Sequence, residues 1–336
     1  MKSKKVILQT LFLVALVVGT ALILRKQQTY WHNEGKVFGT IYHIKYQYGE
    51  DLQSAIEDEL ARVDHSLSPF NKQSVITAVN QNQEVRLDSL FCTVIRRAQQ
   101  ISVDTDGAFD ITVAPLVNAW GFGFKSQSFP DSSLVDSLLQ LTGYQKIRLE
   151  NGRLHKDDPR ILLDCSSIAK GFGCDVVARL FDRRGIDNYL IEIGGEVVAR
   201  GHNPHKQPWG IGISKPIDDS LAVNQELQTV LRLTDIGMAT SGNYRNFYFK
   251  DGKKYAHTID PHTGRPVQHS LLSSTVISAD CMTADAYATA FMVMGLDRAK
   301  ACVERHPELE AYFIYTDSLG QLQTWNSEGL RPYLQK

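Results

Sequence analysis

The stretch Ser278-Ala-Asp-Cys-Met-Thr-Ala-Asp-Ala-Tyr-Ala-Thr-Ala290 predicts a helix that begins near its N-terminal end. Alanine has the highest helix propensity, and Asp280 or Ser278 can cap the helix through a side-chain oxygen. Asp285 and Thr289 are four residues apart, so their oxygens lie on one face of this helix. A carboxylate and a hydroxyl placed in this way suit Mg²⁺, which prefers oxygen ligands. A capped helix with a solvated face is the simpler alternative.

The chain as a whole has an ordinary globular composition. Its 336 residues are 43% hydrophobic and 22% charged, which leaves enough apolar material for a sizeable core. The net charge of -1 gives no general attraction to nucleic acid, so we expect no nucleic-acid partner. The five cysteines contain no Cys-x-x-Cys pair and are odd in number, so we expect small buried residues rather than a metal site.

The N-terminus departs from this composition. Three lysines within residues 1–5 precede an apolar run over residues 6–24, which is long enough to cross a bilayer as a helix. Because basic residues ahead of an apolar span favour a cytoplasmic N-terminus, we predict a single-pass anchor in the bacterial inner membrane and a catalytic body in the periplasm. A cleaved signal peptide is the alternative, although no small-x-small cleavage site follows the run. Residues 25–36 are predicted to form a linker.

Residues 37–332 predict one α+β body. Helical spacing of apolar residues predicts three helices, near residues 52–63, 90–103 and 170–184. The pairs Asn151-Gly152 and Asp251-Gly252 are strong signals for tight β-hairpin turns. The chain contains no internal repeat and no clear interdomain linker.

Several polar groups stand beside predicted helix starts and strand ends. Asp164-Cys-Ser-Ser-Ile-Ala-Lys-Gly171 precedes a helix, whose free N–H groups together with Lys170 suit a phosphate, or it forms an ordinary turn. Glu192-Ile-Gly-Gly-Glu196 lets a flat ligand approach the backbone, or it forms a bulged strand. His257 can act as a base near neutral pH or can be structural. The chain lacks the P-loop, Gly-x-Ser-x-Gly and His-Glu-x-x-His motifs, which excludes the enzyme classes that depend on them.

Further motifs join these along the chain. In order, they are Gly39-Thr40, Gly107-Ala-Phe-Asp-Ile-Thr-Val-Ala-Pro-Leu116, Trp120-Gly-Phe-Gly123, Asp164 with Ile168-Ala-Lys-Gly171, Gly194-Gly-Glu196, Trp209-Gly-Ile-Gly212, Ala239-Thr-Ser-Gly-Asn-Tyr244, His257-Thr-Ile-Asp-Pro261, and Ala284-Asp-Ala286 with Ala288-Thr289. Together they resemble the ApbE family, the Mg²⁺-dependent FAD:protein FMN transferases. The resemblance implies a T-fold-like α+β body with one FAD site between its two halves.

The resemblance also implies a reaction. FAD is cleaved at its pyrophosphate, FMN passes to a threonine hydroxyl of an acceptor protein, and AMP leaves. By this resemblance, Asp285, Thr289 and the backbone carbonyl of Ser167 hold Mg²⁺, and Lys170 neutralises the pyrophosphate. His257 helps to deprotonate the acceptor threonine, a role that Asp285 can share.

The same resemblance implies the remaining flavin contacts. Phe70 lies against a flavin or adenine ring, and the polar contacts come from Thr40, Asp110, Asp164 and Glu196. The family commonly has Tyr where Phe70 stands, so one hydroxyl contact is absent from this chain.

The expected acceptor is an exported, flavin-carrying subunit of a Na⁺-pumping or electron-transport complex. Two other functions fit the same residues. One is a metal-dependent hydrolase that splits FAD into FMN and AMP, and the other is a non-catalytic FAD-binding protein.

Overall fold

The computed structural model describes residues 2–26, 29–123, 129–217, 226–244 and 247–334 of the chain. The strands are β1 (Tyr30–Val37), β2 (Thr40–Gln47), β3 (Ile147–Glu150), β4 (Arg153–Lys156), β5 (Tyr189–Ile193), β6 (Glu196–Arg200), β7 (Trp209–Ser214), β8 (Leu227–Leu233), β9 (Ile236–Gly242), β10 (Phe247–Lys250), β11 (Lys253–Ala256), β12 (Ile259–Asp260), β13 (Arg265–Pro266), β14 (Leu271–Ser278), β15 (Glu310–Thr316) and β16 (Leu322–Asn326). The helices are α1 (Lys2–Lys26), α2 (Gln53–Leu67), α3 (Val75–Asn80), α4 (Ser89–Asp104), α5 (Ala114–Ala119), α6 (Ser132–Leu139), α7 (Ala169–Arg183), α8 (Cys281–Met294) and α9 (Leu296–Arg305), with short 3-10 turns η1 (Ile111–Val113), η2 (Tyr144–Lys146) and η3 (Glu328–Tyr333).

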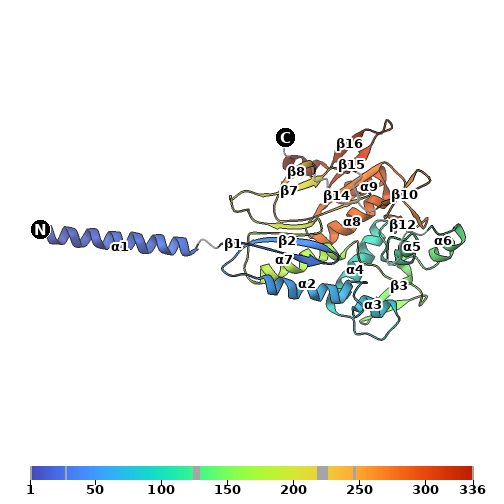
Figure 1. Cartoon of the computed structure of the whole chain (residues 1–336), viewed down its shortest axis with the longest axis horizontal. Helices are drawn as coiled ribbons and strands as arrows, with labels where there is room; N and C mark the ends of the chain where they lie inside the picture. The colour runs from blue at the N-terminus through green and yellow to red at the C-terminus, as the bar shows by residue number, and fades with distance from the viewer. Residues whose placement is uncertain (1, 27–28, 124–128, 218–225, 245–246, 335–336) are drawn as a thin grey trace.

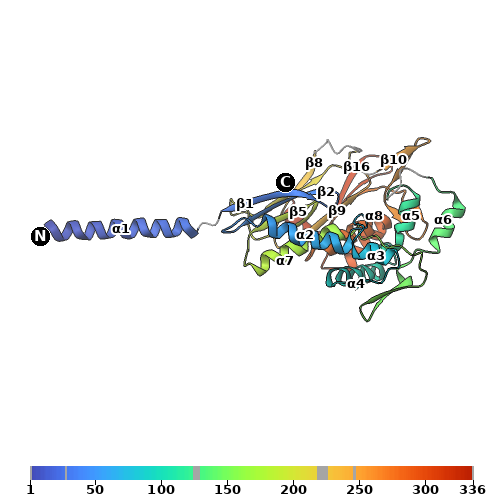
Figure 2. The same ribbon diagram turned by 60° about the horizontal axis from the view of Figure 1, so that its bottom comes forward.

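One eight-stranded sheet runs through the body in the order β1-β2-β5-β6-β9-β14-β15-β16. Every neighbouring pair in it is antiparallel. Helices α2 and α7 lie along one face of the sheet beside β2 and β5, and α8 lies behind β9 and β14 (Figures 1 and 2). The chain therefore has the mixed α and β architecture that its sequence predicts.

Both faces of the central strands are buried, because successive side chains of a strand point to opposite sides. On the helix side, Ala239 and Phe313 belong to the largest apolar cluster of the body. On the other side, Met238 and Ile314 pack against Trp209 of the β7–β8 hairpin. The sheet is thus the middle layer between helices and a small hairpin.

Local sequence signals correctly place several elements. The helices α2, α4 and α7 cover the three segments with helical spacing of apolar residues. Asn151 and Gly152 have φ of 49° and 73°, and Asp251 and Gly252 have φ of 50° and 72°. Positive φ at both central residues is what a tight two-residue hairpin requires, and the two pairs connect β3 to β4 and β10 to β11. All five cysteines are free, and four of them are buried as expected.

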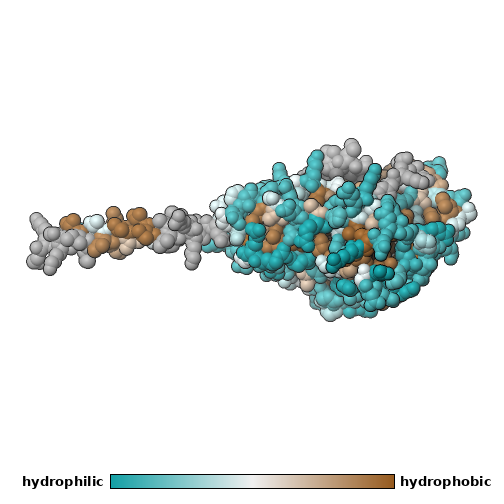
Figure 3. Space-filling view, turned by 90° about the horizontal axis from the view of Figure 1, so that it is seen from below, coloured by the Kyte–Doolittle hydropathy of each residue, from teal (hydrophilic) through white to brown (hydrophobic). Residues whose placement is uncertain are grey.

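The N-terminal helix α1 projects away from the body (Figure 1). Apolar side chains such as Leu11 and Phe12 are exposed along it. Figure 3 shows hydrophobic residues along this helix and a mostly hydrophilic face of the body. Within the described part of the chain, no helix combines the length and the apolar character needed to cross a membrane. The predicted transmembrane anchor over residues 6–24 is therefore not supported.

The predicted linker over residues 25–36 is wrong for most of its length. Helix α1 continues to Lys26, residues 27–28 lie outside the described residues, and β1 begins at Tyr30. The polar residues that suggested a linker pair with β2 along the whole of β1. Because β1 is the edge of the sheet, its outward side chains can be polar.

Candidate active site

Three charged side chains from different elements meet at the N-terminal end of α7. The Nζ atom of Lys170, in the first turn of α7, lies 3.1 Å from Oε1 of Glu196 and 3.8 Å from Oδ2 of Asp285. Glu196 begins β6 and Asp285 lies in α8, and both are almost completely buried. The structure therefore brings together three residues that the sequence predicts for the site.

Burial and mutual charge set the protonation of these groups. Burial raises the pKa of Glu196 to about 8, with Lys170 opposing the shift and Asp285 adding to it. Burial likewise raises the pKa of Asp285, against the effects of Lys170 and of the Gly171 N–H. Burial alone would lower the pKa of Lys170, but the two carboxylates outweigh it and raise that pKa. Lys170 therefore stays cationic. Its single positive charge does not return the pKa of either acid to its ordinary value.

One oxygen of this cluster has no partner among the described residues. Oε2 of Glu196 is buried and accepts no hydrogen bond from any described residue. Buried carboxylate oxygens are almost always paired with a donor or a cation. The orphaned oxygen indicates that a ligand completes the cluster.

The close contact of α7 and α8 explains how Asp285 reaches Lys170. The N–H of Gly171 donates to Oδ2 of Asp285 at 3.0 Å. A Cβ atom on Gly171 would lie 2.3 Å from the carbonyl oxygen of Cys281 and 2.8 Å from Cβ of Asp285. Only glycine therefore lets the two helix backbones approach this closely.

The start of α8 is fixed by two carboxylates. Asp280 is its N-cap and accepts from the N–H of Thr283 at 2.8 Å, which confirms one of the two caps that the sequence offered. Asp175 of α7 accepts from the N–H groups of Cys281 and Met282, at 2.8 and 2.9 Å. These contacts hold α8 in the register that turns Asp285 toward α7.

Thr289 follows Asp285 by one helical turn on α8. Its Oγ1 lies 3.1 Å from Oγ of Ser241, which belongs to β9. Ser167 lies in the turn before α7, and Lys170 reaches this same turn by donating to the carbonyl of Ser166 at 3.4 Å. Asp285 and the turn that carries Ser167 therefore border one charged cluster, whereas the contact of Thr289 with an ion stays a prediction. All of the proposed donor atoms are oxygens.

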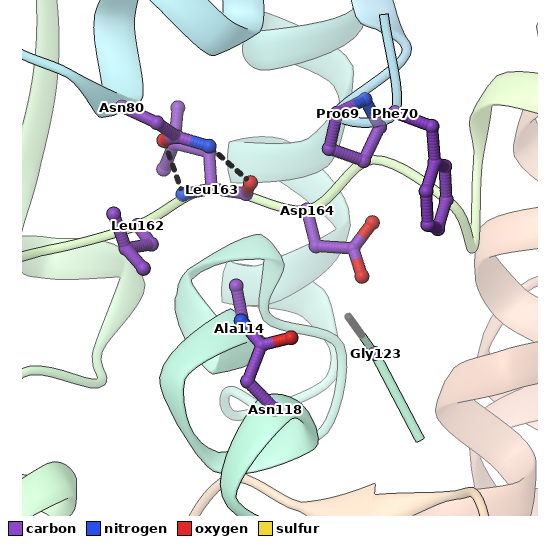
Figure 4. A pocket seen from close by; sticks show the side chains of 9 residues that line it. All are labelled: Pro69, Phe70, Asn80, Ala114, Asn118, Gly123, Leu162, Leu163 and Asp164. Carbon is purple, nitrogen blue, oxygen red and sulfur yellow. Dashed lines mark hydrogen bonds between the residues drawn. The ribbon is translucent and has the colours of Figure 1, made fainter. Parts of the chain in front are cut away.

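A pocket lies beside Asp164, three residues before Ser167 in the same turn. Figure 4 shows the Asp164 carboxylate pointing into the space between Phe70, Asn118 and Gly123. The same carboxylate accepts from the N–H and the hydroxyl of Ser166, at 2.8 and 2.5 Å. The exposed ring of Phe70 forms one wall of the pocket, which suits a flat aromatic ligand.

Thr40 and Asp110, the other two predicted polar contacts, have different surroundings. A Cβ atom on Gly194 would lie 2.8 Å from Cγ2 of Thr40, so Thr40 borders the turn that leads to Glu196. Asp110 is buried and accepts from the N–H and the hydroxyl of Thr112, at 2.8 and 2.7 Å. The Asp110 carboxylate thus caps η1, and its contact with a flavin stays a prediction.

His257 lies between β11 and β12. Its ring meets the ring of Phe122 edge-on, with the centroids 6.4 Å apart. The next residue, Thr258, donates to Oδ1 of Asn243 at 2.7 Å and so ties this segment to the end of β9. Ser241 of β9 also contacts Thr289. Strand β9 and the residue that follows it therefore contact both the segment of His257 and the Thr289 hydroxyl of α8.

Several residues of the site have no local sequence signal. Asn80 exchanges two hydrogen bonds with the backbone of Leu163, at 2.8 and 2.9 Å, and thereby positions Asp164 (Figure 4). Arg97 donates to Oγ1 of Thr283 from two nitrogens, at 3.0 and 2.8 Å. Both contacts join residues far apart in the chain, so only the tertiary structure identifies them.

Known proteins share this architecture and sequence. The sequence profile of the ApbE family matches residues 38–313. The FAD:protein FMN transferase of Vibrio cholerae serotype O1 is 37% identical over 316 residues, covering 91% of this chain and 93% of that protein. The FAD:protein FMN transferase of Escherichia coli K12 is 36% identical over 315 residues, covering 90% of this chain and 88% of that protein.

Solved structures agree with these sequence matches. The flavin transferase ApbE from Vibrio cholerae superposes with a TM-score of 0.83 at 36% identity, covering 91% of this chain and 100% of that one. The apo flavinyl transferase ApbE of Pseudomonas stutzeri gives a TM-score of 0.81 at 31% identity, covering 91% and 97%. With a family match over residues 38–313 and relatives well above 30% identity along most of its length, this chain belongs to the ApbE family.

Proposed function

We propose that this enzyme transfers FMN from FAD to a threonine hydroxyl of an acceptor protein in an Mg²⁺-dependent reaction that releases AMP. The observation that carries the proposal is the meeting of Lys170 with Asp285 and Glu196 beside the turn that carries Ser167. Phosphoryl transfer depends on positioning the phosphates and neutralising the charge on their oxygens, and this cluster supplies the groups for it. The names of the relatives support FAD as the flavin donor.

The donor set fits Mg²⁺. Asp285, Thr289 and the Ser167 carbonyl offer oxygen atoms only, and Mg²⁺ usually binds a few protein oxygens and completes its shell with water and phosphate. The unpaired oxygen of Glu196 indicates that more positive charge or a donor is needed here. When bound, the ion would neutralise the pyrophosphate oxygens during transfer.

The protein groups then have separate roles in the reaction. Lys170 would hold the pyrophosphate by charge, and the pocket of Phe70 and Asp164 would hold the ring and polar parts of FAD. His257 would accept the proton of the acceptor threonine as its oxygen attacks the phosphorus on the FMN side. A new P–O bond forms to that oxygen, the pyrophosphate P–O bond breaks, and AMP leaves with the electron pair.

We infer that the acceptor is an exported flavin-carrying subunit of a Na⁺-pumping or electron-transport complex, and that the enzyme works on the periplasmic side of the bacterial inner membrane. The lysine-rich tip followed by an apolar run is typical of an export signal and supports a periplasmic location. Separation of periplasm, membrane and cytoplasm from cells, followed by immunodetection of the chain, tests the location. Finding the chain only with cytoplasm would contradict it.

The reaction is tested by incubating the purified full-length chain with FAD, Mg²⁺ and a purified acceptor domain. We expect the acceptor mass to rise by one FMN group while AMP appears in equal amount, and we expect a chelator to prevent both. An acceptor whose target threonine is replaced by valine should gain no mass. AMP without a mass increase would indicate a hydrolase, and neither product would indicate a flavin-binding protein.

Variants then test the metal assignment. Asp285→Ala and Thr289→Val should lose Mg²⁺-dependent transfer while their circular dichroism spectra stay unchanged. Asp187→Ala, which removes an exposed aspartate outside the site, is the matched control and should keep wild-type activity. Full activity of Asp285→Ala would show that the metal ligands are misassigned.

A further inference from the structure

Two histidines and a glutamate come together on the β1–β2 hairpin, on the face of the sheet that lies opposite α2 and α7. His32 and Glu34 are two residues apart on β1, and Glu34 pairs directly with His43 of β2. Because strand side chains alternate, these three lie on the face opposite Tyr42 and Ile44, which are buried against α2 and α7. Lys170 belongs to the other side of the sheet, because α7 and the Glu196 side chain lie on the face of Tyr42.

The donor atoms of this cluster are close enough to share one ion. One donor atom from each of His32, Glu34 and His43 lies within 4.8 Å of the other two. Nδ1 of His43 is 3.5 Å from Oε2 of Glu34, and the rings of His32 and His43 have centroids 6.1 Å apart. Ligands bound about 2.1 Å from a tetrahedral ion are about 3.4 Å from one another, so the His43–Glu34 pair already has the right spacing.

The remaining adjustment is small. His32 is exposed, so its ring can rotate toward the other two donors without displacing any core residue. The backbone is already fixed, because β1 and β2 pair along their whole length. A site on a rigid hairpin loses little conformational freedom when the ion binds.

From this geometry we propose that His32, Glu34 and His43 form a second metal site, which binds Zn²⁺ or a similar first-row transition ion. Two imidazoles and one carboxylate are a common zinc ligand set and leave a fourth position open to water. Imidazole nitrogen favours Zn²⁺, Cu²⁺ and Ni²⁺ over Mg²⁺, so the two sites differ in their preferred ion.

The cluster has charged neighbours of both signs on the same face of the sheet. Lys45 is the cross-strand neighbour of His32, and Lys36 follows Glu34 on the same face of β1. Glu192 of β5 is the cross-strand neighbour of His43 and offsets part of this positive charge. A bound ion would link the edge strand β1 to β2, next to the point where α1 enters the body.

The test is a Zn²⁺ titration of the full-length chain after removal of metal with a chelator, in the presence of excess Mg²⁺. Calorimetry and metal analysis after equilibrium dialysis should show one Zn²⁺ per chain, and Co²⁺ should give the visible spectrum of a tetrahedral site. His32→Ala and His43→Ala should each weaken Zn²⁺ binding about tenfold or more, since loss of even an outer partner of a ligand costs that much.

Two control variants keep the result specific. His155→Asn removes an exposed strand histidine whose cross-strand neighbour is Arg148, and it should bind Zn²⁺ like wild type. Asp285→Ala should also bind Zn²⁺ like wild type, which separates this site from the proposed Mg²⁺ site. Zn²⁺ should raise the thermal unfolding midpoint of wild type more than that of His32→Ala at the same Zn²⁺ concentration. The proposal is overturned if wild type shows no saturable Zn²⁺ binding, if both histidine variants bind as tightly as wild type, or if Asp285→Ala loses the ion.

Discussion

Lys170 is the residue that balances the charge of the site. It is the cation between the two buried acids Glu196 and Asp285, and about a quarter of its own side chain is exposed. Bringing such charges out of water is costly, and their mutual attraction offsets that cost only while every partner is present. The stability of the body and the chemistry of the site therefore depend on the same ammonium group.

Replacing Lys170 by Met tests this dependence. Lys170→Met keeps most of the side-chain length but leaves Glu196 and Asp285 facing each other, so we expect the free energy of unfolding to fall by about 3 kcal/mol. Urea denaturation measures this fall, and the double variant Lys170→Met/Glu196→Gln should recover part of it, because an amide cannot become a second buried negative charge beside Asp285. A Lys170→Met variant as stable as wild type would mean that Glu196 and Asp285 are both protonated in the folded chain and need no cation between them.

At the level of elements, the site depends on the contact between α7 and α8. Gly171 allows the two helices to touch, and Asp175 and Asp280 fix where α8 begins. Lys170 and Asp285 are carried by these two helices, so a small change in helix spacing moves one relative to the other. Geometry of this kind is sensitive to single methyl groups.

Gly171→Ala should separate the helices. Its Cβ atom would overlap the Cys281 carbonyl, so we expect a loss of about 1–3 kcal/mol in unfolding free energy together with loss of FMN transfer. Gly49→Ala is the control, because a Cβ atom there meets no other atom within 4 Å. Equal stability and activity of the two variants would contradict the close approach of α7 and α8.

Asp175 predicts a pH dependence of stability. Burial, together with the nearby charge of Asp280, raises its pKa from 3.8 to about 7 in the folded chain. The folded chain therefore holds this proton more tightly than the unfolded chain, so the contribution to stability is complete below about pH 4 and is lost as the pH rises through about 7.

The Asp175→Asn variant cannot undergo this loss. Between about pH 5 and pH 8, the unfolding free energy of wild type should fall by roughly 2 kcal/mol more than that of Asp175→Asn. Urea denaturation at the two pH values measures the difference, with Asp187→Asn as an exposed control that should follow wild type. Parallel pH profiles for wild type and Asp175→Asn would show that Asp175 is not protonated on folding.

The elements also show what the sequence can predict. The hairpin turns at Asn151 and Asp251, and the cap at Asp280, follow from local rules, because each depends on residues within three positions. Strand β1 is missed because an edge strand with polar outward residues has the composition of a linker. Asp175 is missed as a cap because its partners at α8 lie 106 and 107 positions away in the sequence.

The site residues likewise divide into those that sequence motifs indicate and those that only the folded structure identifies. The motifs around Lys170, Glu196 and Asp285 indicate these residues through the family resemblance, and the structure brings them within hydrogen-bonding or ion-pair distance. For Asp110 the sequence alone does not distinguish a ligand contact from a local cap, and the structure shows the cap. The support from Asn80 and Arg97 depends on folding and has no motif.

At the scale of the whole molecule, the body and α1 are separate parts. The body holds the sheet, its helices and the site, whereas α1 projects from the edge next to β1 (Figures 1 and 2). The stability of the body should therefore not depend on α1, whatever α1 does in the cell.

A chain that lacks residues 1–28 tests this separation. We expect its thermal unfolding midpoint to stay within about 2 °C of the full-length chain, because no element of the core is removed. Its FMN transfer to a soluble acceptor domain should also be unchanged. A drop of many degrees would show that α1 supports the fold of the body.

The sequence separation of the site residues determines when the site can be completed during synthesis. The N–H of Gly171 meets the carboxylate of Asp285 across 114 positions of sequence, and β9 lies between β6 and β14. A ribosome must therefore release α8 before any nascent chain contains the charged cluster. Folds built from such distant pairings form slowly, so the new chain stays open to proteases and chaperones for longer than a helical bundle of equal size.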